Sequence, residues 1–371
     1  MLRRTRFISI HNLVVAVLML SSSKIANLPT ASATRTTKLA LLHPKKITKS
    51  WEPRFLARVE RELRQSTECG FEVVDRIEEA DHLLYLDSSM EHSTKELVIH
   101  KELLEWAKRL GKFVSALSFK DRPFGVLPGI YTSLETRNLD PQLHLSWPHL
   151  EPPNDYVEDV VKRPSDQTSC LFSFTGSSSH RIRRRLFSTY DSSVNAKWNV
   201  KEVKRWFDHT EDEKKDYVED ILDSRFILCP RGIACYSHRI LETILLERVP
   251  VIIADDWVPF SFTEQDYYIQ IAEKDVGDIA SRLEHAIENY DFYLSNILQV
   301  KSKWLVPQNR YLKAVGHYLN LHRQNQTAHD PAALLDRVQS FDFLKSNRLL
   351  SHQRVFSTVG AIAGVGRKML R

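Results

Sequence analysis

The stretch SRFILCPRGIACYSHRILETILLERVPVIIAD, which spans residues 224–255, decides the fold that this chain is expected to adopt. Two apolar runs, Ser224–Cys229 and Val249–Ala254, have the length of buried strands, and the second is rich in β-branched residues. Pro230-Arg231-Gly232 breaks the chain after the first run, and Ser237–Leu246 has helical spacing. Short apolar strands that alternate with a helix indicate an α/β fold with a parallel sheet covered on both faces.

The loop between the first strand and the helix is the first candidate site. In α/β proteins, ligands bind beyond the carboxyl ends of the parallel strands. Gly232 allows close approach to the backbone, the guanidinium groups of Arg231 and Arg239 match phosphate oxygens, and a helix start offers free N–H groups. Glu242, one turn into the helix, can accept hydrogen bonds from sugar hydroxyls. The combination predicts a site for a nucleotide diphosphate-sugar.

The same stretch resembles the exostosin family of glycosyltransferases, and the resemblance extends over roughly residues 171–260. The residues that match the family pattern, in order, are Ser224-Arg225-Phe226, Cys229-Pro230-Arg231-Gly232, Ser237-His238-Arg239, Glu242 and Val249-Pro250-Val251-Ile252 ending at Asp255. The family usually has a small Ala-Gly pair before the last strand, whereas this chain has Leu246-Glu247-Arg248. The resemblance implies the GT-B fold, in which two Rossmann-like, doubly wound α/β domains face a cleft, and it implies sugar transfer with inversion at the anomeric carbon.

An ordinary α/β unit is the alternative interpretation of these residues. Their charges would then form a solvated face, with Ser237 capping the helix and Glu242 paired with Arg239. The ordered pattern over residues 224–255 favours the donor site instead.

A second loop, Thr175–Ser179, follows a predicted strand and opens the predicted helix His180–Tyr190, which carries four arginines near its start. Gly176 in this loop and Arg181 in the helix are expected to contact the donor phosphates, and Arg183 is a weaker candidate. The alternative is a basic helix on the surface.

Sugar transfer requires that negative charge on the departing nucleotide diphosphate be stabilised. Because the sequence has no Asp-x-Asp motif, arginines are expected to take the place of a metal ion, and no metal ligand or cofactor is expected apart from the donor substrate. Arg239 is the expected catalytic residue. The expected donor-binding residues are Gly176, Arg181, Arg231, Gly232, Ser237 and Glu242.

The general base for the acceptor hydroxyl is not identified by the sequence. Asp87 and His43 each follow a predicted strand of the first domain, and both are weak candidates. Trp257, beside Asp255-Asp256, either stacks on a sugar ring or belongs to a turn that closes the strand. His238 is expected to be a structural histidine.

The length of 371 residues suits two domains, and the composition is that of a globular protein. Net charge is +5, from 52 Lys and Arg against 47 Asp and Glu, which is too small an excess to indicate nucleic acid. The absence of GxxxxGK[ST] disfavours a phosphate-binding kinase. A glycosyltransferase that modifies a glycan or glycoconjugate is therefore the leading hypothesis. A catalytically inactive glycan- or nucleotide-binding protein of the same fold is the alternative.

Alternating strand and helix patterns, and a proline-rich region without periodicity, divide the chain into five expected parts. These are a leader or weakly membrane-associated segment (1–37), an N-terminal Rossmann-like acceptor-side domain (38–150), an interdomain crossing (151–168), a C-terminal nucleotide-sugar-binding domain (169–320) and a helical tail (321–371). The basic amphipathic pattern of residues 355–371 suits a membrane surface. A cytoplasmic or membrane-associated location is expected, with a Golgi or secretory-pathway membrane as the alternative.

Overall fold

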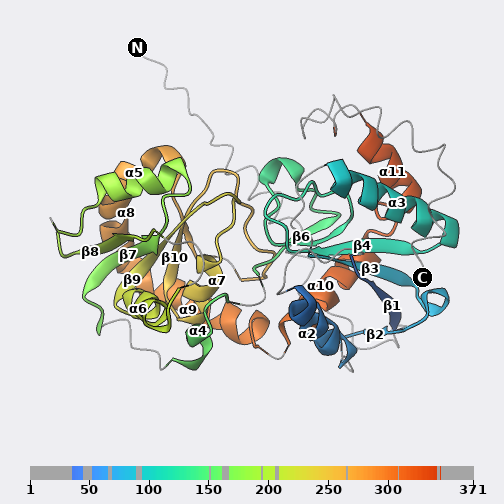
Figure 1. Cartoon of the computed structure of the whole chain (residues 1–371), viewed down its shortest axis with the longest axis horizontal. Helices are drawn as coiled ribbons and strands as arrows, with labels where there is room; N and C mark the ends of the chain where they lie inside the picture. The colour runs from blue at the N-terminus through green and yellow to red at the C-terminus, as the bar shows by residue number, and fades with distance from the viewer. Residues whose placement is uncertain are drawn as a thin grey trace, which may run out of the picture. The chain divides into compact units, whose positions relative to one another are not determined.

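A computed structural model of the chain describes residues 36–44, 52–65, 69–88, 94–149, 152–160, 167–193, 195–204, 209–264, 266–307, 309–340 and 343. They form two β-sheets, in each of which all neighbouring strands pair in parallel (Figure 1). The expected leader, apart from Thr36 and Thr37, and the basic segment 355–371 lie outside the described residues.

The first sheet has six strands in the order β2-β1-β3-β4-β5-β6. Their bounds are β1 Thr37–Leu42, β2 Phe71–Val73, β3 His82–Asp87, β4 Phe113–Ser118, β5 Gly129–Tyr131 and β6 His144–Ser146. The two central strands β3 and β4 are almost wholly buried, which agrees with their continuous apolar sequences.

The second sheet has five strands in the order β11-β10-β9-β7-β8. Their bounds are β7 Cys170–Gly176, β8 Trp198–Glu202, β9 Ser224–Pro230, β10 Val249–Ile253 and β11 Ile269–Gln270. The two apolar runs of the signature stretch are therefore adjacent strands, in a register that places Val249 beside Phe226 and Ile252 beside Cys229.

Helices cover both faces of each sheet (Figure 1). Their bounds are α2 Glu52–Arg64, α3 Thr94–Leu110, α4 Tyr156–Asp159, α5 Arg181–Thr189, α6 Glu211–Leu222, α7 Arg239–Leu245, α8 Ile279–Ala286, α9 Tyr290–Trp304, α10 Arg310–Gln324 and α11 Pro331–Gln339. Helix α6 begins with a capping box, because Thr210 accepts from the Glu213 backbone and Glu213 accepts from the Thr210 backbone. No helix of the described residues is long and apolar enough to cross a membrane.

The expected α/β fold with two doubly wound parallel sheets is confirmed, with two corrections to its elements. The sequence pattern of Val276–Tyr290 predicts one helix, but α8 occupies only its middle, between the 3-10 turns Glu273–Asp278 and Ile287–Asn289, and α9 begins at Tyr290. The proline-rich region without periodicity, Pro141–Pro164, contains the strand β6, which is too short to show a period. The domain boundaries themselves stay a prediction.

The chain returns to the first sheet after completing the second. Helix α10 contacts α2 and β5, and α11 lies against α3. At the start of α10, the backbone N–H of Tyr311 donates to Glu62 Oε1 of α2 at 2.8 Å. The two sheets are thus joined by the last helices as well as by the crossing between them.

Candidate functional site

The signature loop, residues 231–238, lies at the carboxyl edge of the second sheet, where the strand order reverses. Strand β7 pairs with β8 on one side and with β9 on the other, so the chain crosses β7 on its way from β8 to β9. Open α/β sheets bind ligands at such a switch point. The Arg231 N–H donates to the Ile253 carbonyl at 3.1 Å, which fastens the loop to the end of β10. Gly176 ends β7 at the same edge, so both predicted loops meet there.

Arg239, the predicted catalytic residue, begins α7 and is only 9% exposed. Its guanidinium lies 4.7 Å from the Phe174 ring centroid and 5.6 Å from that of Tyr217, and it donates to the Thr175 carbonyl. Its Nε is buried and makes no hydrogen bond within the described part of the chain. Because buried N–H groups are nearly always bonded, Arg239 presents a spare donor beside the end of β7.

Glu242 lies one turn further along α7 and is buried. The Tyr217 hydroxyl donates to its Oε2 at 2.6 Å. Burial raises the pKa of Glu242, while the hydrogen bond from Tyr217 and the charge of Arg239 oppose that effect. The carboxyl group is therefore held against α6, and its contact with a donor sugar or ribose stays a prediction.

Arg231 is surrounded by three carboxylates. Its Nη1 lies 3.4 Å from Asp256 Oδ2 and 3.6 Å from Glu273 Oε1, and its Nη2 lies 4.0 Å from Glu135 Oε1. These distances exceed the roughly 2.7–2.9 Å of a charge-assisted hydrogen bond. The Arg231 Nε is buried and is not hydrogen-bonded to any described residue. An anion at this place would meet a guanidinium that is oriented but incompletely bonded.

The remaining predicted side chains differ in exposure. The Arg181 side chain is 76% exposed and lies 3.3 Å from Glu273 Oε2, so Glu273 contacts both Arg181 and Arg231. Ser237 is buried, and its carbonyl accepts from the Ile240 N–H at 3.0 Å. The residue at the N-terminal cap of α7 is His238. The alternative in which Ser237 caps this helix is therefore wrong.

The two predicted glycines are sites of close approach by guanidinium groups. A Cβ added at Gly176 would lie 3.2 Å from Arg239 Nη2 and 3.0 Å from the Phe174 ring. A Cβ at Gly232 would lie 3.2 Å from Arg183 Nη2. Larger residues at these positions would displace the arginines from the switch point.

Arg183, the weaker candidate for phosphate contact, bonds to the backbone at the start of the signature loop, a role that was not predicted for it. Its Nε donates to the Arg231 carbonyl at 3.1 Å and its Nη2 to the Pro230 carbonyl at 3.2 Å. Burial, with the nearby Arg239 charge, lowers its pKa to about 10. The signal was present, since Ile182 and Leu186 mark the buried face of α5 and Arg183 lies on that face, three residues before Leu186.

Loops from the first sheet contact the signature loop. Arg122 Nε donates to the Ile233 carbonyl at 2.8 Å, and the His149 N–H donates to the Tyr236 hydroxyl at 3.2 Å. Glu135 forms an isolated antiparallel bridge with Trp257. The first sheet therefore supplies part of the surroundings of this loop.

The weaker candidates are placed as follows. Asp87 is 1% exposed and cannot meet an acceptor in this arrangement, whereas His43 is exposed, 3.5 Å from Glu60. Trp257 is buried and packs edge-on against neighbouring aromatic rings, so it offers no free face for a sugar. His238 is exposed, and its ring lies 4.0 Å from that of His149 with the two ring planes tilted by 35°, so its expected structural role stays a prediction.

These features define a class: a two-sheet α/β protein whose switch point carries buried arginines beside two glycines. Comparison with known proteins makes the class specific. A family model described as the Exostosin GT47 domain matches residues 129–286. The resemblance noted in the signature stretch is confirmed for this part of the chain.

Curated relatives share a short region of high similarity. A probable glucuronosyltransferase of Oryza sativa subsp. japonica is 43% identical over 75 residues, which are 19% of this chain and 18% of that protein. The exostosin-1 homolog of Caenorhabditis elegans is 36% identical over 105 residues, 24% of this chain and 28% of that protein. The matches thus span about a quarter or less of these relatives' length. Among solved structures, WaaG, a glycosyltransferase involved in lipopolysaccharide biosynthesis, has a TM-score of 0.35 at 9% identity, covering 76% of this chain and 99% of that one.

Proposed function

We propose that this chain is a glycosyltransferase that moves a sugar from a nucleotide diphosphate-sugar to a hydroxyl of a glycan or glycoconjugate. The exostosin GT47 match over residues 129–286 supports this class of reaction. The observation that carries the proposal is the pair of buried arginines, Arg231 and Arg239, whose Nε atoms lack hydrogen bonds to described residues at the switch point. Such donors, fixed before the substrate arrives, suit the diphosphate of a sugar nucleotide.

In the proposed reaction, the acceptor oxygen forms a bond to the anomeric carbon while the bond from that carbon to the diphosphate breaks. The acceptor proton passes to a base that the geometry does not assign. Negative charge grows on the departing diphosphate, and Arg239 is the residue proposed to stabilise it. The aromatic rings of Phe174 and Tyr217 hold this guanidinium in place, so little reorganisation is needed during the step. Attack from the face opposite the leaving group inverts the anomeric configuration.

Arginine charge is proposed to replace a metal ion at the diphosphate. Asp255 and Asp256, the acidic pair nearest the signature, already have partners: Asp255 Oδ1 accepts from the Glu273 N–H at 2.9 Å, and Asp256 contacts Arg231. Turnover measured after EDTA treatment is expected to remain near the untreated value. A loss of turnover that Mn²⁺ restores in the wild type but not in an Asp256→Asn variant would contradict the proposal and indicate a required metal at the diphosphate.

Binding is the experiment that tests the site itself. The change in Tm should be measured with uridine, guanosine and cytidine diphosphates and with the corresponding nucleotide diphosphate-sugars. At least one of these compounds is expected to stabilise the protein. At a hundredfold excess over Kd, the gain is about 2.7 kcal/mol for a ligand that binds only the native state. No shift with any of these compounds at millimolar concentration would contradict the proposal. Binding without turnover on any acceptor would instead favour a catalytically inactive binding protein.

A further inference from the structure

A second group of chemically reactive side chains lies in the first sheet, away from the signature loop. Asp87 is the last residue of β3, and Glu96 and His100 lie one turn apart on α3. Lys120 follows β4. All four side chains are buried, with exposed fractions of 1% or 2%. The group lies at the carboxyl end of the two central strands of the sheet.

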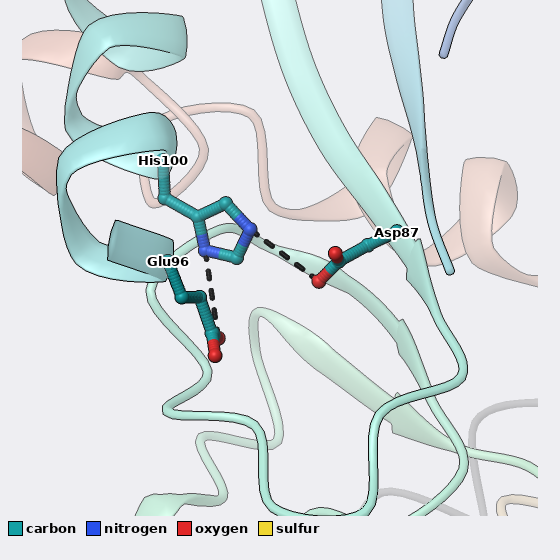
Figure 2. A group of neighbouring side chains, drawn as sticks. All are labelled: Asp87, Glu96 and His100. Atoms are coloured by element: carbon teal, nitrogen blue, oxygen red, sulfur yellow. Dashed lines mark ion pairs between the residues drawn. The ribbon is translucent and has the colours of Figure 1, made fainter. Parts of the chain in front are cut away.

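The His100 imidazole lies between the two carboxylates, with one ring nitrogen directed at each (Figure 2). Its Nε2 is 3.5 Å from Asp87 Oδ2, and its Nδ1 is 3.8 Å from Glu96 Oε1. Both ring nitrogens are buried and form no hydrogen bond with the described residues. A buried imidazole with neither nitrogen bonded is rare, and here it is directed into an acidic group.

Each of the two carboxylates also has one oxygen that makes no hydrogen bond to the described residues and pairs instead with the Lys120 ammonium. Asp87 Oδ1 and Glu96 Oε2 make no hydrogen bond in the described part of the chain. The other oxygen of each carboxylate accepts a hydrogen bond that fixes the orientation of the group. Ser118 Oγ donates to Asp87 Oδ2 at 3.2 Å, and the Phe124 N–H donates to Glu96 Oε1 at 3.3 Å. Contacts of this kind are typical of metal-ligating carboxylates, whose orientation is set by a second layer of hydrogen bonds.

We propose that Asp87, Glu96 and His100 bind one divalent first-row metal ion, for which Zn²⁺ is the reference probe. One ligand atom from each residue lies within 4.8 Å of the others, so small side-chain movements would bring all three to the roughly 2.0–2.2 Å of Zn–N and Zn–O bonds. An imidazole nitrogen with two carboxylate oxygens is a ligand set that suits such ions. The ion would join the end of β3 to α3.

The Lys120 ammonium occupies the place beside the carboxylates that a metal ion would need. Its Nζ lies 3.4 Å from Asp87 Oδ1 and 3.3 Å from Glu96 Oε2, the same oxygens that lack hydrogen bonds. The ammonium group therefore offsets part of the negative charge of the two carboxylates in the arrangement seen here. Metal binding requires that this ammonium move away, so the ion and Lys120 compete for the same oxygens. Removal of the lysine charge is expected to strengthen metal binding by about tenfold or more.

The test measures bound metal per chain in the full-length protein. The protein is stripped with a chelator and dialysed against micromolar Zn²⁺, and the metal is quantified by mass spectrometry. Co²⁺ replacement adds an absorption spectrum that reports ligand geometry. One ion per chain is expected for the wild type, and tighter binding for Lys120→Met. His100→Gln is expected to lose the ion, and Ser118→Ala to weaken binding about 10- to 100-fold.

His209 provides a matched control, because its Nδ1 lies 3.8 Å from Glu213 Oε2 at the same i, i+4 spacing but on the exposed surface. His209→Ala is expected to leave metal binding unchanged. The proposal is overturned if the folded wild type binds no metal, whether or not Lys120→Met does. It is also overturned if His209→Ala reduces binding as much as His100→Gln. If His100→Gln does not fold, Ser118→Ala takes its place in the test, because Ser118→Ala removes only a hydroxyl group.

Discussion

Arg239 combines a full charge with an unbonded buried donor. Its neighbours Phe174 and Tyr217 supply aromatic faces, and the Thr175 carbonyl accepts from its Nη2. A buried charge with an unpaired donor lowers the stability of the fold unless a bound anion offsets the cost of desolvation. A bound diphosphate is the compensation that the proposed function supplies.

Arg239→Ala is therefore expected to lower kcat by about 100- to 1000-fold, because the residue meets charge that grows as the diphosphate departs. Arg184→Ala is the control, since Arg184 is an exposed arginine on α5 whose guanidinium donates to the Ser178 carbonyl. Steady-state kinetics on both variants checks the role. Near-normal kcat in Arg239→Ala would show that the assignment is wrong.

Glu242→Gln is expected to raise the donor KM with a smaller change in kcat, because contacts with hydroxyls are similar in the ground and transition states. Glutamine also retains an acceptor for the Tyr217 hydroxyl, so the fold is expected to survive. Kinetics at saturating donor separate the two parameters. A fall in kcat with unchanged KM would instead give Glu242 a part in the chemical step.

At the scale of elements, the junction between α7 and β10 departs from the family pattern. Glu247 has a left-handed backbone with φ of 59°, a conformation that glycine adopts without strain. Its carboxylate pairs with Lys301 of α9. Arg248 is fully buried and donates to the Leu222 carbonyl at 2.8 Å. The chain thus accommodates large residues where the family usually has a small pair.

Comparison of Glu247→Gly with Glu247→Ala isolates the backbone strain, because both variants lose the carboxylate. Glu247→Gly is expected to be more stable by about 1 kcal/mol, the usual cost of a Cβ in the left-handed region. Urea denaturation measures this difference in the free energy of unfolding. Equal stability, or a more stable alanine variant, would mean that the junction relaxes to another conformation.

Much of the sheet around the signature was predictable from sequence, because β9 and β10 are continuous apolar runs broken by Pro230-Arg231-Gly232. The strands β5 and β6, at three residues each, are too short to show a period. At the site, the two loops that meet at the switch point were predicted from their residues. The ring contacts of Arg239 were not, because Phe174 and Tyr217 come from separate elements and only the packing brings them together.

At the scale of the whole molecule, Glu62 connects α2 to the start of α10. Its Oε1 accepts from the backbone N–H groups of Tyr311 and Leu312. Burial raises the pKa of Glu62 to about 7, although these hydrogen bonds and the charges of Arg58 and Arg310 act in the opposite direction. The joint between the first sheet and the returning helix therefore contains a carboxyl group that ionises near neutral pH.

This raised pKa makes stability depend on pH in a definite direction. Below about pH 4.5 the carboxyl group is protonated in both states, and between 4.5 and 7 the unfolded state ionises first, so stability falls as pH rises. Glu62→Gln removes this loss. The free energy of unfolding of Glu62→Gln minus that of the wild type is expected to increase by about 1 to 2 kcal/mol from pH 4.5 to pH 8, allowing for partial hydration of the carboxyl group. Denaturation at both pH values checks this, and a pH-independent difference would contradict it.

The measurement that tests the central claim most directly is NMR observation of the donor's anomeric signals during turnover. The best-binding nucleotide diphosphate-sugar is incubated with wild-type protein and a panel of glycan acceptors, with Arg239→Ala in parallel. We predict that the wild type releases the nucleoside diphosphate, that the new glycosidic bond has the opposite anomeric configuration, and that Arg239→Ala is at least about 100-fold slower. Retained configuration, or no consumption of a donor that binds at the signature loop, would contradict the account.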